Sequence, residues 1–482
     1  MKGIAVLFTR LFPLAMAMLG LGCATTNAPV ETPANNRPFP QRAAASFAVA
    51  PTMPGTITPA RMDSMALALF RQILENDLVV DSWGPQTAEG FRLALRHFQE
   101  AEVIEGGQAV SHIATSESQG YGMMILVLMS GNEESLAGHR WLFGSSDLQD
   151  YFDAMLRSVQ FFPSSGSSLF TWRLWGYRDN LPAGVGPGGY LLADGMRSAP
   201  FSRDEVFSSS YTEGDMDIIY SLILADRQWG SSGRYDYLGI ARSMLADLWK
   251  HCVNDAHRFL LQGDWVKGFA NPIHDSVARS SSLIISHLAA FRDVDPDHRW
   301  QDVIDASFRM IMHVRDRQNA LGRNNGLLPD YMVLGADGWD IPSGGMVEYF
   351  NNAFGFDAVR IPWRLGASYL LLGNAAIGES SLYDYIIRPL DDFARAFPGG
   401  LGSLGPVGMN GLALVAAPNW FAPPFAVTAM ATGADRQWID SFWKEPGSEL
   451  GFRGMGSYQG DTYGDYIRLL VLLVLSGNYW LP

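Results

Sequence analysis

Apolar residues recur at spacings of three and four along most of the chain. Met65, Leu69 and Ile73 would share one face of a helix. A later segment repeats this pattern with Leu238, Ala241, Leu245 and Leu248. Further helices are predicted near residues 145–162, 280–292, 299–316, 363–372, 380–395 and 461–476. Strand-like alternation is scarce, so the pattern predicts an all-α protein of about a dozen helices, a number that fits a toroid of paired helices.

The first residues have the pattern of an export signal. Two basic residues precede an apolar run, 11–21, which is too short to span a membrane. The segment that ends at Cys23 resembles a bacterial lipobox, and Ala24 in place of Asp favours sorting to the outer membrane. We therefore expect residues 1–23 to be a signal peptide, Cys23 to be lipidated, and the protein to face the periplasm or the cell surface. Ordinary cleavage, giving a periplasmic or secreted protein, is the alternative.

The next segment, residues 24–59, is rich in Ala, Pro, Thr and Asn and has little periodicity. It is predicted to be a flexible tether before a single folded domain, residues 60–482. Besides Cys23 the only cysteine is Cys252, so no internal disulfide is expected. Cys252 is predicted to be buried near the end of a helix.

Composition narrows the function. Hydrophobic residues make up 48% of the chain, enough for a large core, and 14 Trp, 17 Tyr and 27 Phe include candidates for stacking on sugar rings. The net charge of −14 argues against a nucleic-acid partner, because phosphate binding needs clustered Lys and Arg. His274 and the other histidines have no metal-ligand spacing, and neither a G-x-S-x-G motif nor a P-loop occurs. We expect no metal, no cofactor and a monomer.

One carboxylate, Glu117, lies among small hydroxyl residues just before an apolar run. Ser116 and Gln119 have the spacing of a capping box, so a helix is predicted to begin there with Glu117 at its mouth. Gly120 and Gly122 would leave space beside Glu117 for a bulky ligand. The structural alternative is that Glu117 only caps the helix and favours its dipole.

A second acidic cluster, Glu213, Asp215 and Asp217, precedes another apolar run. It reads either as a ligand-binding cluster or as an acidic helix N-terminus that favours the dipole. A calcium loop is a weaker option, because the Gly and the distal Glu of an EF-hand are missing. Upstream, Trp172 could stack on a sugar or belong to the core, and the Gly- and Ser-rich connection 178–210 could form one wall of a cleft.

The third acidic segment is Phe356–Arg364. Pro362 suits the first turn of a helix, which places Asp357 in the loop just before it. Arg360 would pair with a nearby carboxylate and fix its position, or serve a purely structural role.

In order, these segments resemble the motifs of glycoside hydrolase family 8. The closing helix, with Tyr463–Leu470, resembles the family's last helix, so the resemblance covers about residues 60–482. It implies an (α/α)6 barrel that hydrolyses β-1,4-glucan, mixed-linkage glucan, xylan or chitosan with inversion. The segments are Ser116–Met123, Phe170–Arg173, Thr212–Trp229, Gly326–Tyr331 and Phe356–Arg364.

The resemblance also implies roles. Glu117 would be the proton donor and Asp357 the general base. Glu213 is the third catalytic candidate, which would hold the sugar ring in a distorted shape; it stands where the family usually has Asp beside the central subsite. Phe356 stands where the family often has Tyr, and Asp330 would be a structural acid. Tyr121, Trp172, Asp215 and Arg360 are the candidate substrate-binding residues.

Three functions remain open on the sequence. The first is an endo-β-1,4-glucanase, with cellulose or exopolysaccharide metabolism as one setting, and retention of Asp357 favours a neutral glycan of this kind. A xylan- or chitosan-type glycanase on the same site is the second. The third is a non-catalytic, lipid-anchored glycan-binding protein, which the departures at Glu213 and Phe356 leave open.

One physical conflict follows from the acid assignment. A helix N-terminus stabilises charged Glu117 and lowers its pKa, whereas a general acid must hold its proton near working pH. We expect burial, or the neighbouring Glu213, to outweigh the dipole.

Overall fold

The computed structural model describes residues 36–482 except for 82–83, 98–101, 106–107, 146, 165, 178–208, 269–271, 344–350, 375–381, 417–419, 434 and 445–461. The described residues all belong to one compact unit that begins at Asn35. The predicted signal peptide with Cys23, and most of the predicted cleft wall 178–210, lie outside the described residues. They stay predictions.

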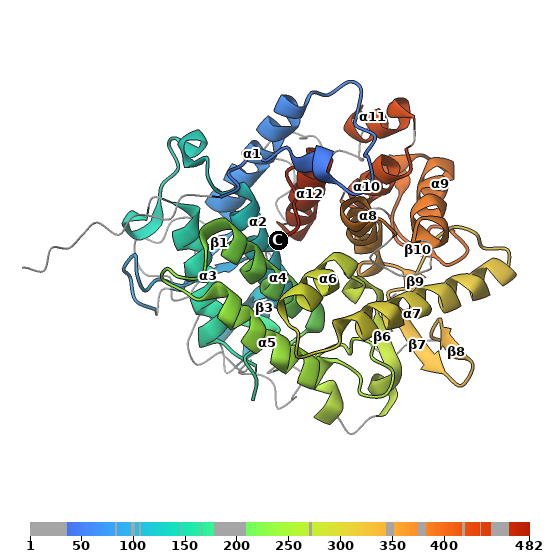
Figure 1. Ribbon diagram of the computed structural model, residues 1–482, viewed down its shortest axis with the longest axis horizontal. Helices are drawn as coiled ribbons and strands as arrows, with labels where there is room; N and C mark the ends of the chain where they lie inside the picture. Colours follow the sequence, from blue (N-terminus) through green and yellow to red (C-terminus); the bar gives the residue numbers. More distant parts are fainter. Residues whose placement is uncertain are drawn as a thin grey trace, which may run out of the picture. The chain divides into compact units, whose positions relative to one another are not determined.

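The described residues form twelve α-helices (Figure 1). They are α1 (Pro59–Asn76), α2 (Ser116–Met129), α3 (Leu148–Phe161), α4 (Thr212–Trp229), α5 (Tyr237–Cys252), α6 (Ile285–Val294), α7 (Trp300–Ala320), α8 (Ile361–Leu372), α9 (Arg388–Ala396), α10 (Pro423–Ala431), α11 (Arg436–Lys444) and α12 (Thr462–Leu475). All predicted helical segments are found, and α10 and α11 were not predicted. A π-helical turn, Tyr383–Ile387, leads into α9.

The even-numbered helices form a closed ring. Each of α2, α4, α6, α8 and α10 packs against the next, and α12 packs back against α2. The odd-numbered helices lie outside this ring: α1 against α12, α3 against α2, α5 against α4, α7 against α6, and both α9 and α11 against α10 (Figure 1). This arrangement confirms the predicted (α/α)6 barrel.

The inner and outer helices differ in how much of their surface is buried, as their apolar patterns do. Every residue of α2 and α10 is buried, as expected for helices apolar on all sides. Outer helices bury only one face: Met65, Leu69 and Ile73 of α1 are buried, as predicted, and Cys252 is buried as the last residue of α5. Among the described residues no helix is both long and apolar enough to cross a membrane.

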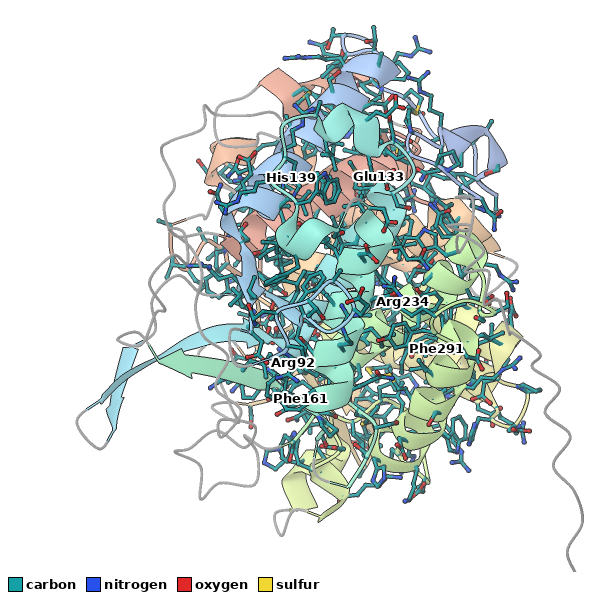
Figure 2. The ribbon with its side chains drawn as sticks, turned by 90° about the vertical axis from the view of Figure 1, so that its left-hand side faces the viewer. Arg92, Glu133, His139, Phe161, Arg234 and Phe291 are labelled. Atoms are coloured by element: carbon teal, nitrogen blue, oxygen red, sulfur yellow. The ribbon has the colours of Figure 1, made fainter. Side chains whose placement is uncertain are left out.

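Short antiparallel sheets join the helices at the ring's edge. The pairs are β1 (Leu78–Val80) with β2 (Leu93–Leu95), and β9 (Ala353–Phe354) with β10 (Val407–Gly408). The three-stranded sheets are β3 (Glu102–Glu105), β4 (Gln108–Thr115) and β5 (Arg173–Tyr177), and β6 (Val277–Arg279), β7 (Tyr331–Gly335) and β8 (Gly338–Asp340). The ribbon of β3, β4 and β5 projects away from the helices (Figure 2).

The space predicted beside Gly120 and Gly122 is not open to a ligand. A Cβ on Gly120 would lie 2.5 Å from the Cβ of Asp217, and one on Gly122 would lie 2.6 Å from Met155. A Cβ on Gly214 would lie 2.3 Å from the hydroxyl of Ser116. Glycines therefore let α2 and α4 approach closely, and the prediction of an open space was wrong because helix packing fills it.

The predicted tether is also too long. From Asn36 onward the chain lies against the helices: Phe39 donates its backbone N–H to Ser130, Val49 to Leu370 and Thr52 to Met430. Phe39 and Phe47 are buried. Residues 36–59 therefore belong to the folded unit, because two buried aromatic rings outweigh a Pro- and Ala-rich composition.

Candidate active site

Three carboxylates from distant parts of the chain meet where inner helices begin. Glu117 is the second residue of α2 and Glu213 the second residue of α4. Asp357 comes just before a short 3-10 turn, Ala358–Arg360, that continues into α8. All three are almost fully buried, with exposures of 5%, 1% and 6%.

The start of α2 is held by hydrogen bonds on several sides. Thr115, rather than the predicted Ser116, is the N-cap, and its partner in the capping box is Ser118. The predicted partner Gln119 instead donates its amide to the carbonyls of Leu93 and Met155. Glu117 is thus the second helical residue, one position later than predicted, and its backbone is fixed on both sides.

Arg279, at the end of β6, bridges all three carboxylates. Its Nη1 lies 3.0 Å from Oε1 of Glu213 and 4.0 Å from Oε1 of Glu117. Its Nε and Nη2 donate to the two carboxyl oxygens of Asp357. Because one guanidinium spans these contacts, the Glu117 and Asp357 oxygens lie no more than about 9 Å apart, a limit compatible with the roughly 6.5–9.5 Å of inverting glycosidases.

Arg360, in the 3-10 turn before α8, also bridges two of the carboxylates, Glu213 and Asp357. It donates from Nη1 to Oε1 of Glu213 (3.2 Å) and to the hydroxyl of Tyr463 (2.8 Å), and from Nη2 to Asp357. The ring of Tyr463 stacks on His97 with centroids 4.4 Å apart. Asp357 thus accepts two bonds at Oδ1 and one at Oδ2, which leaves one acceptor position on Oδ2 for a further donor.

The electrostatics separate the two glutamates. Burial, followed by the charge of Glu213, raises the pKa of Glu117 to about 7 against the opposing charges of Arg279 and Arg360. Burial alone would raise the pKa of Glu213 too, but the guanidiniums of Arg279, Arg360 and Arg364 lower it to about 2. The expected conflict at Glu117 is therefore resolved in favour of the protonated acid.

A charge count leads to the same assignment. Glu117, Glu213 and Asp357 supply three carboxyl groups, while Arg279 and Arg360 supply two positive charges. The cluster is neutral when one carboxyl is protonated, and a buried cluster without net charge is favoured. Glu117 is the carboxyl furthest from a guanidinium, so it keeps the proton.

Asp330 fixes the loop that carries Asp357 through hydrogen bonds to its backbone. Its Oδ1 accepts the backbone N–H groups of Gly355 (3.0 Å), Asp357 (3.1 Å) and Ala358 (2.7 Å). Burial, followed by the charge of Asp357, raises the pKa of Asp330. Asp330 is structural, as its position in the sequence suggested.

A second ion pair lies deeper in the barrel. Arg364 donates to both carboxyl oxygens of Asp217 (2.8 and 3.2 Å), and Nε2 of His287 lies 3.0 Å from Asp217. The hydroxyl of Tyr121 lies 3.1 Å from Nη2 of Arg364 and 3.2 Å from the Tyr463 hydroxyl. Tyr121 therefore connects this pair to the outer cluster.

The remaining candidates occupy different surroundings. Trp172 is partly exposed and stacks on Tyr211 with centroids 4.3 Å apart, and its carbonyl accepts the N–H of Ser116. Asp215 is fully buried and accepts the N–H of Phe170 (2.8 Å), so it faces backbone in this structure. Phe356, by contrast, is 42% exposed directly beside Asp357 and packs on Trp420 and Phe421.

Sequence reasoning missed Arg279 and did not assign a role to Tyr463. Arg279 lies in a segment of small residues with no acidic neighbour, and no local pattern distinguishes it from a surface arginine. Tyr463 was noted only within the closing helix. The available signal was that the motif acids outnumber the arginines Arg360 and Arg364 of the Phe356–Arg364 motif, so a further cation was to be expected.

The chain is similar to known glycoside hydrolases. The model of the family described as glycosyl hydrolases family 8 matches residues 197–375. A β-glucanase of Niallia circulans is 26% identical over 454 residues, which cover 93% of this chain and 92% of the relative. An endoglucanase of Bacillus sp. strain KSM-330 is 25% identical over 388 residues, 80% of this chain and 72% of the relative.

Solved structures share the fold. The apo structure of a β-1,3-1,4-glucanase from Paenibacillus sp. X4 matches with a TM-score of 0.72 at 26% identity, covering 93% of this chain and all of that one. A cold-adapted family 8 xylanase matches with a TM-score of 0.60 at 14% identity, covering 89% and 93%. With its closed ring of paired helices and its three converging carboxylates, this chain is a glycoside hydrolase that resembles the members of glycosyl hydrolase family 8.

Proposed function

We propose that this enzyme hydrolyses β-glucan internally and with inversion, using Glu117 as general acid and Asp357 as general base. The observation that carries the proposal is the buried Glu117, whose pKa is raised to about 7, held across the Arg279 bridge from Asp357. Two carboxyls in different protonation states on one site are what inverting hydrolysis needs.

Each carboxyl has a defined task in this mechanism. Glu117 donates its proton to the glycosidic oxygen as the bond from that oxygen to the anomeric carbon breaks. Asp357 accepts a proton at the open position of Oδ2 from a water that attacks the anomeric carbon on the opposite face. Glu213, kept charged by two guanidiniums, accepts a hydrogen bond from a sugar hydroxyl and holds the ring in a distorted shape.

The substrate class rests on the relatives and on the charge balance of the site. Their names are β-glucanase, endoglucanase and β-1,3-1,4-glucanase. A neutral glucan also suits the site, because the acidic carboxyls and guanidiniums already balance one another. Tyr121 and Asp215 would act on the substrate through the residues they hold, whereas Trp172 and Arg360 would approach it directly.

The test is reducing-end release from carboxymethylcellulose, mixed-linkage glucan, xylan and chitosan by residues 36–482. The wild type is compared with Glu117→Gln and Asp357→Asn, and we expect a loss of about 10²- to 10⁴-fold on a glucan for the acid variant. Proton NMR of the first product follows the anomer, which should be inverted. Retention of configuration, or release from xylan or chitosan alone, would contradict the proposal, and binding without any release would favour a non-catalytic glycan-binding protein.

We further propose that the chain is exported and lipid-anchored through Cys23. The support is the basic and apolar pattern of residues 1–23 and the segment that ends at this cysteine. Labelled fatty acid should enter the full-length protein but not Cys23→Ser, and the variant should leave the membrane fraction. Equal labelling of both would overturn the proposal.

A further inference from the structure

Arg279 is the one described side chain that contacts all three carboxyls of the site. It is 6% exposed and lies between the rings of Tyr211 and Tyr331, with its guanidinium carbon 4.9 and 5.7 Å from their centroids. In the sheet, Arg279 of β6 pairs directly with Tyr331 of β7. The guanidinium is therefore held by backbone pairing on one side and by aromatic faces on the other.

The contact with Glu213 depends on the length of that side chain. Oε1 of Glu213 lies 3.0 Å from Nη1 of Arg279 and 3.2 Å from Nη1 of Arg360, so one oxygen joins both guanidiniums. An aspartate at this position, with one methylene fewer, would fall short of this shared point. The longer side chain of Glu213 thus ends at a point that both guanidiniums share.

We propose that Arg279 and Glu213 form a matched pair of positioning residues that determines which carboxyl holds the proton. Glu213 disfavours ionisation of Glu117 and so keeps the proton there, whereas the charge of Arg279, which touches both glutamates, acts on Glu117 in the opposite direction and limits that effect. This inference rests on the proposed function, because it assigns the origin of the acid's protonation. It also explains how the site uses Glu213 in place of Asp without losing its acid.

Every charged or titratable group that faces Glu117 enters this argument. Glu213 disfavours the charged form of Glu117, whereas Arg279 and Arg360 favour it. The groups are Glu213 and Asp215 from α4, Arg279 from β6, Asp357 and Arg360 from the 3-10 turn before α8, and Tyr463 from α12. The two members of the proposed pair therefore act on Glu117 with opposite signs.

Because Arg279 and Glu213 shift the pKa of Glu117 in opposite directions, substituting each residue in turn tests the proposal. The basic limb of kcat/KM against pH reports the ionisation of the acid in the free enzyme. Arg279→Gln removes a positive charge, so the limb should move up, and Glu213→Gln removes a negative charge, so it should move down. We expect about one pH unit in each direction, since a charge within about 4–6 Å shifts a pKa by roughly 1–3 units. Shifts in the same direction, or none, would overturn the proposal.

Two further variants distinguish the effect of the Arg279 charge from a general loss of structure. Arg279→Lys keeps the charge but lacks the two-pronged geometry, so its limb should stay near that of the wild type while kcat falls. Arg234→Gln is the matched control, because Arg234 binds Asp150 and Asp153 of α3 (2.8 and 3.1 Å) instead of the three carboxyls. It should change thermal stability without moving the limb.

The failure of this inference is distinguishable from that of the proposed function. A wild type that releases no sugar from any of the four polymers defeats the proposed function. Hydrolysis that Glu117→Gln abolishes, together with limbs that do not move, defeats only the pairing of Arg279 and Glu213. Should Arg279→Gln not fold, Glu213→Gln decides alone, and a limb that stays or rises contradicts the proposal.

Discussion

Glu117 shows how burial outweighs the helix dipole at a single residue. A rise of its pKa from 4.5 to about 7 corresponds to roughly 3 kcal/mol of preference for the neutral form. The dipole at an exposed helix N-terminus contributes only about 0.3–1 kcal/mol in the other direction. The helix N-terminus therefore positions the acid, while burial and Glu213 keep it protonated.

This elevated pKa predicts a stability effect of known sign. Because the folded pKa lies above the unfolded one, the native state binds more protons between about pH 4.5 and 7, and stability falls as pH rises through that window. Glu117→Gln mimics the neutral acid and removes this loss. It should raise the free energy of unfolding at pH 8, by up to about 3 kcal/mol, and change it little at pH 4.

Urea unfolding at both pH values measures the difference. Glu134→Gln is the control, because Glu134 is exposed and follows the opposite end of α2 from Glu117, so it should not reproduce the stabilisation at pH 8. A Glu117→Gln variant that is no more stabilised at pH 8 than at pH 4 would contradict the raised pKa.

We predict that Phe356 contributes to substrate binding. It is the one aromatic ring among the large hydrophobic side chains of the described chain that are exposed, and it lies next to Asp357. An exposed ring beside a carbohydrate site offers an apolar face to a sugar. Phe356→Ala should raise KM several-fold with a smaller fall in kcat, and Phe356→Tyr should keep the wild-type KM. A fall in kcat alone would instead indicate a role in holding Asp357.

At the scale of elements, Asp330 fixes the backbone of the loop that carries Asp357. One carboxyl oxygen accepts three backbone N–H groups, so the turn before α8 has its donors satisfied and Asp357 has one position. Leaving three buried donors unpaired costs about 1–3 kcal/mol for each group.

Asp330 therefore predicts a contrast between two substitutions. Asp330→Ala should lower thermal stability and reduce kcat by an order of magnitude or more, because Asp357 loses its fixed position. Asp330→Asn keeps an oxygen acceptor and should retain most of both. Thermal unfolding and steady-state kinetics on the same preparations check this, and equal losses in the two variants would exclude the proposed acceptor role.

Local pattern explains how much of the molecule could be predicted. Helix faces such as Met65, Leu69 and Ile73 were found because periodicity is a local property, and the motif acids lie at helix starts that are visible in sequence. Arg279 was missed because its partner Asp357 is 78 residues away and its segment has no periodic signal. Likewise, Gly120 and Gly214 were understood only when α2 and α4 were seen to touch.

At the scale of the whole molecule, the segment before α1, residues 36–58, contacts both α1 and the residues that follow α12. Arg42 donates its backbone N–H to Asn478 and its side chain to Asp63, and Ala43 donates to the carbonyl of Gly477. The segment thereby joins α1 to the end of α12, where the last inner helix meets the first. Hydrogen bonds of this kind help to hold together the N-terminal and C-terminal parts of the folded unit.

The segment therefore predicts where the folded enzyme begins. A chain starting at residue 36 should unfold at a higher temperature than one starting at residue 50, which loses the buried rings of Phe39 and Phe47, each worth about 1.5–3 kcal/mol. The double variant Phe39→Ala/Phe47→Ala in the longer chain separates these rings from the backbone contacts and should lie between the two. Equal unfolding temperatures for the two lengths would mean that the segment is a tether after all, because a tether contributes nothing to the free energy of the fold.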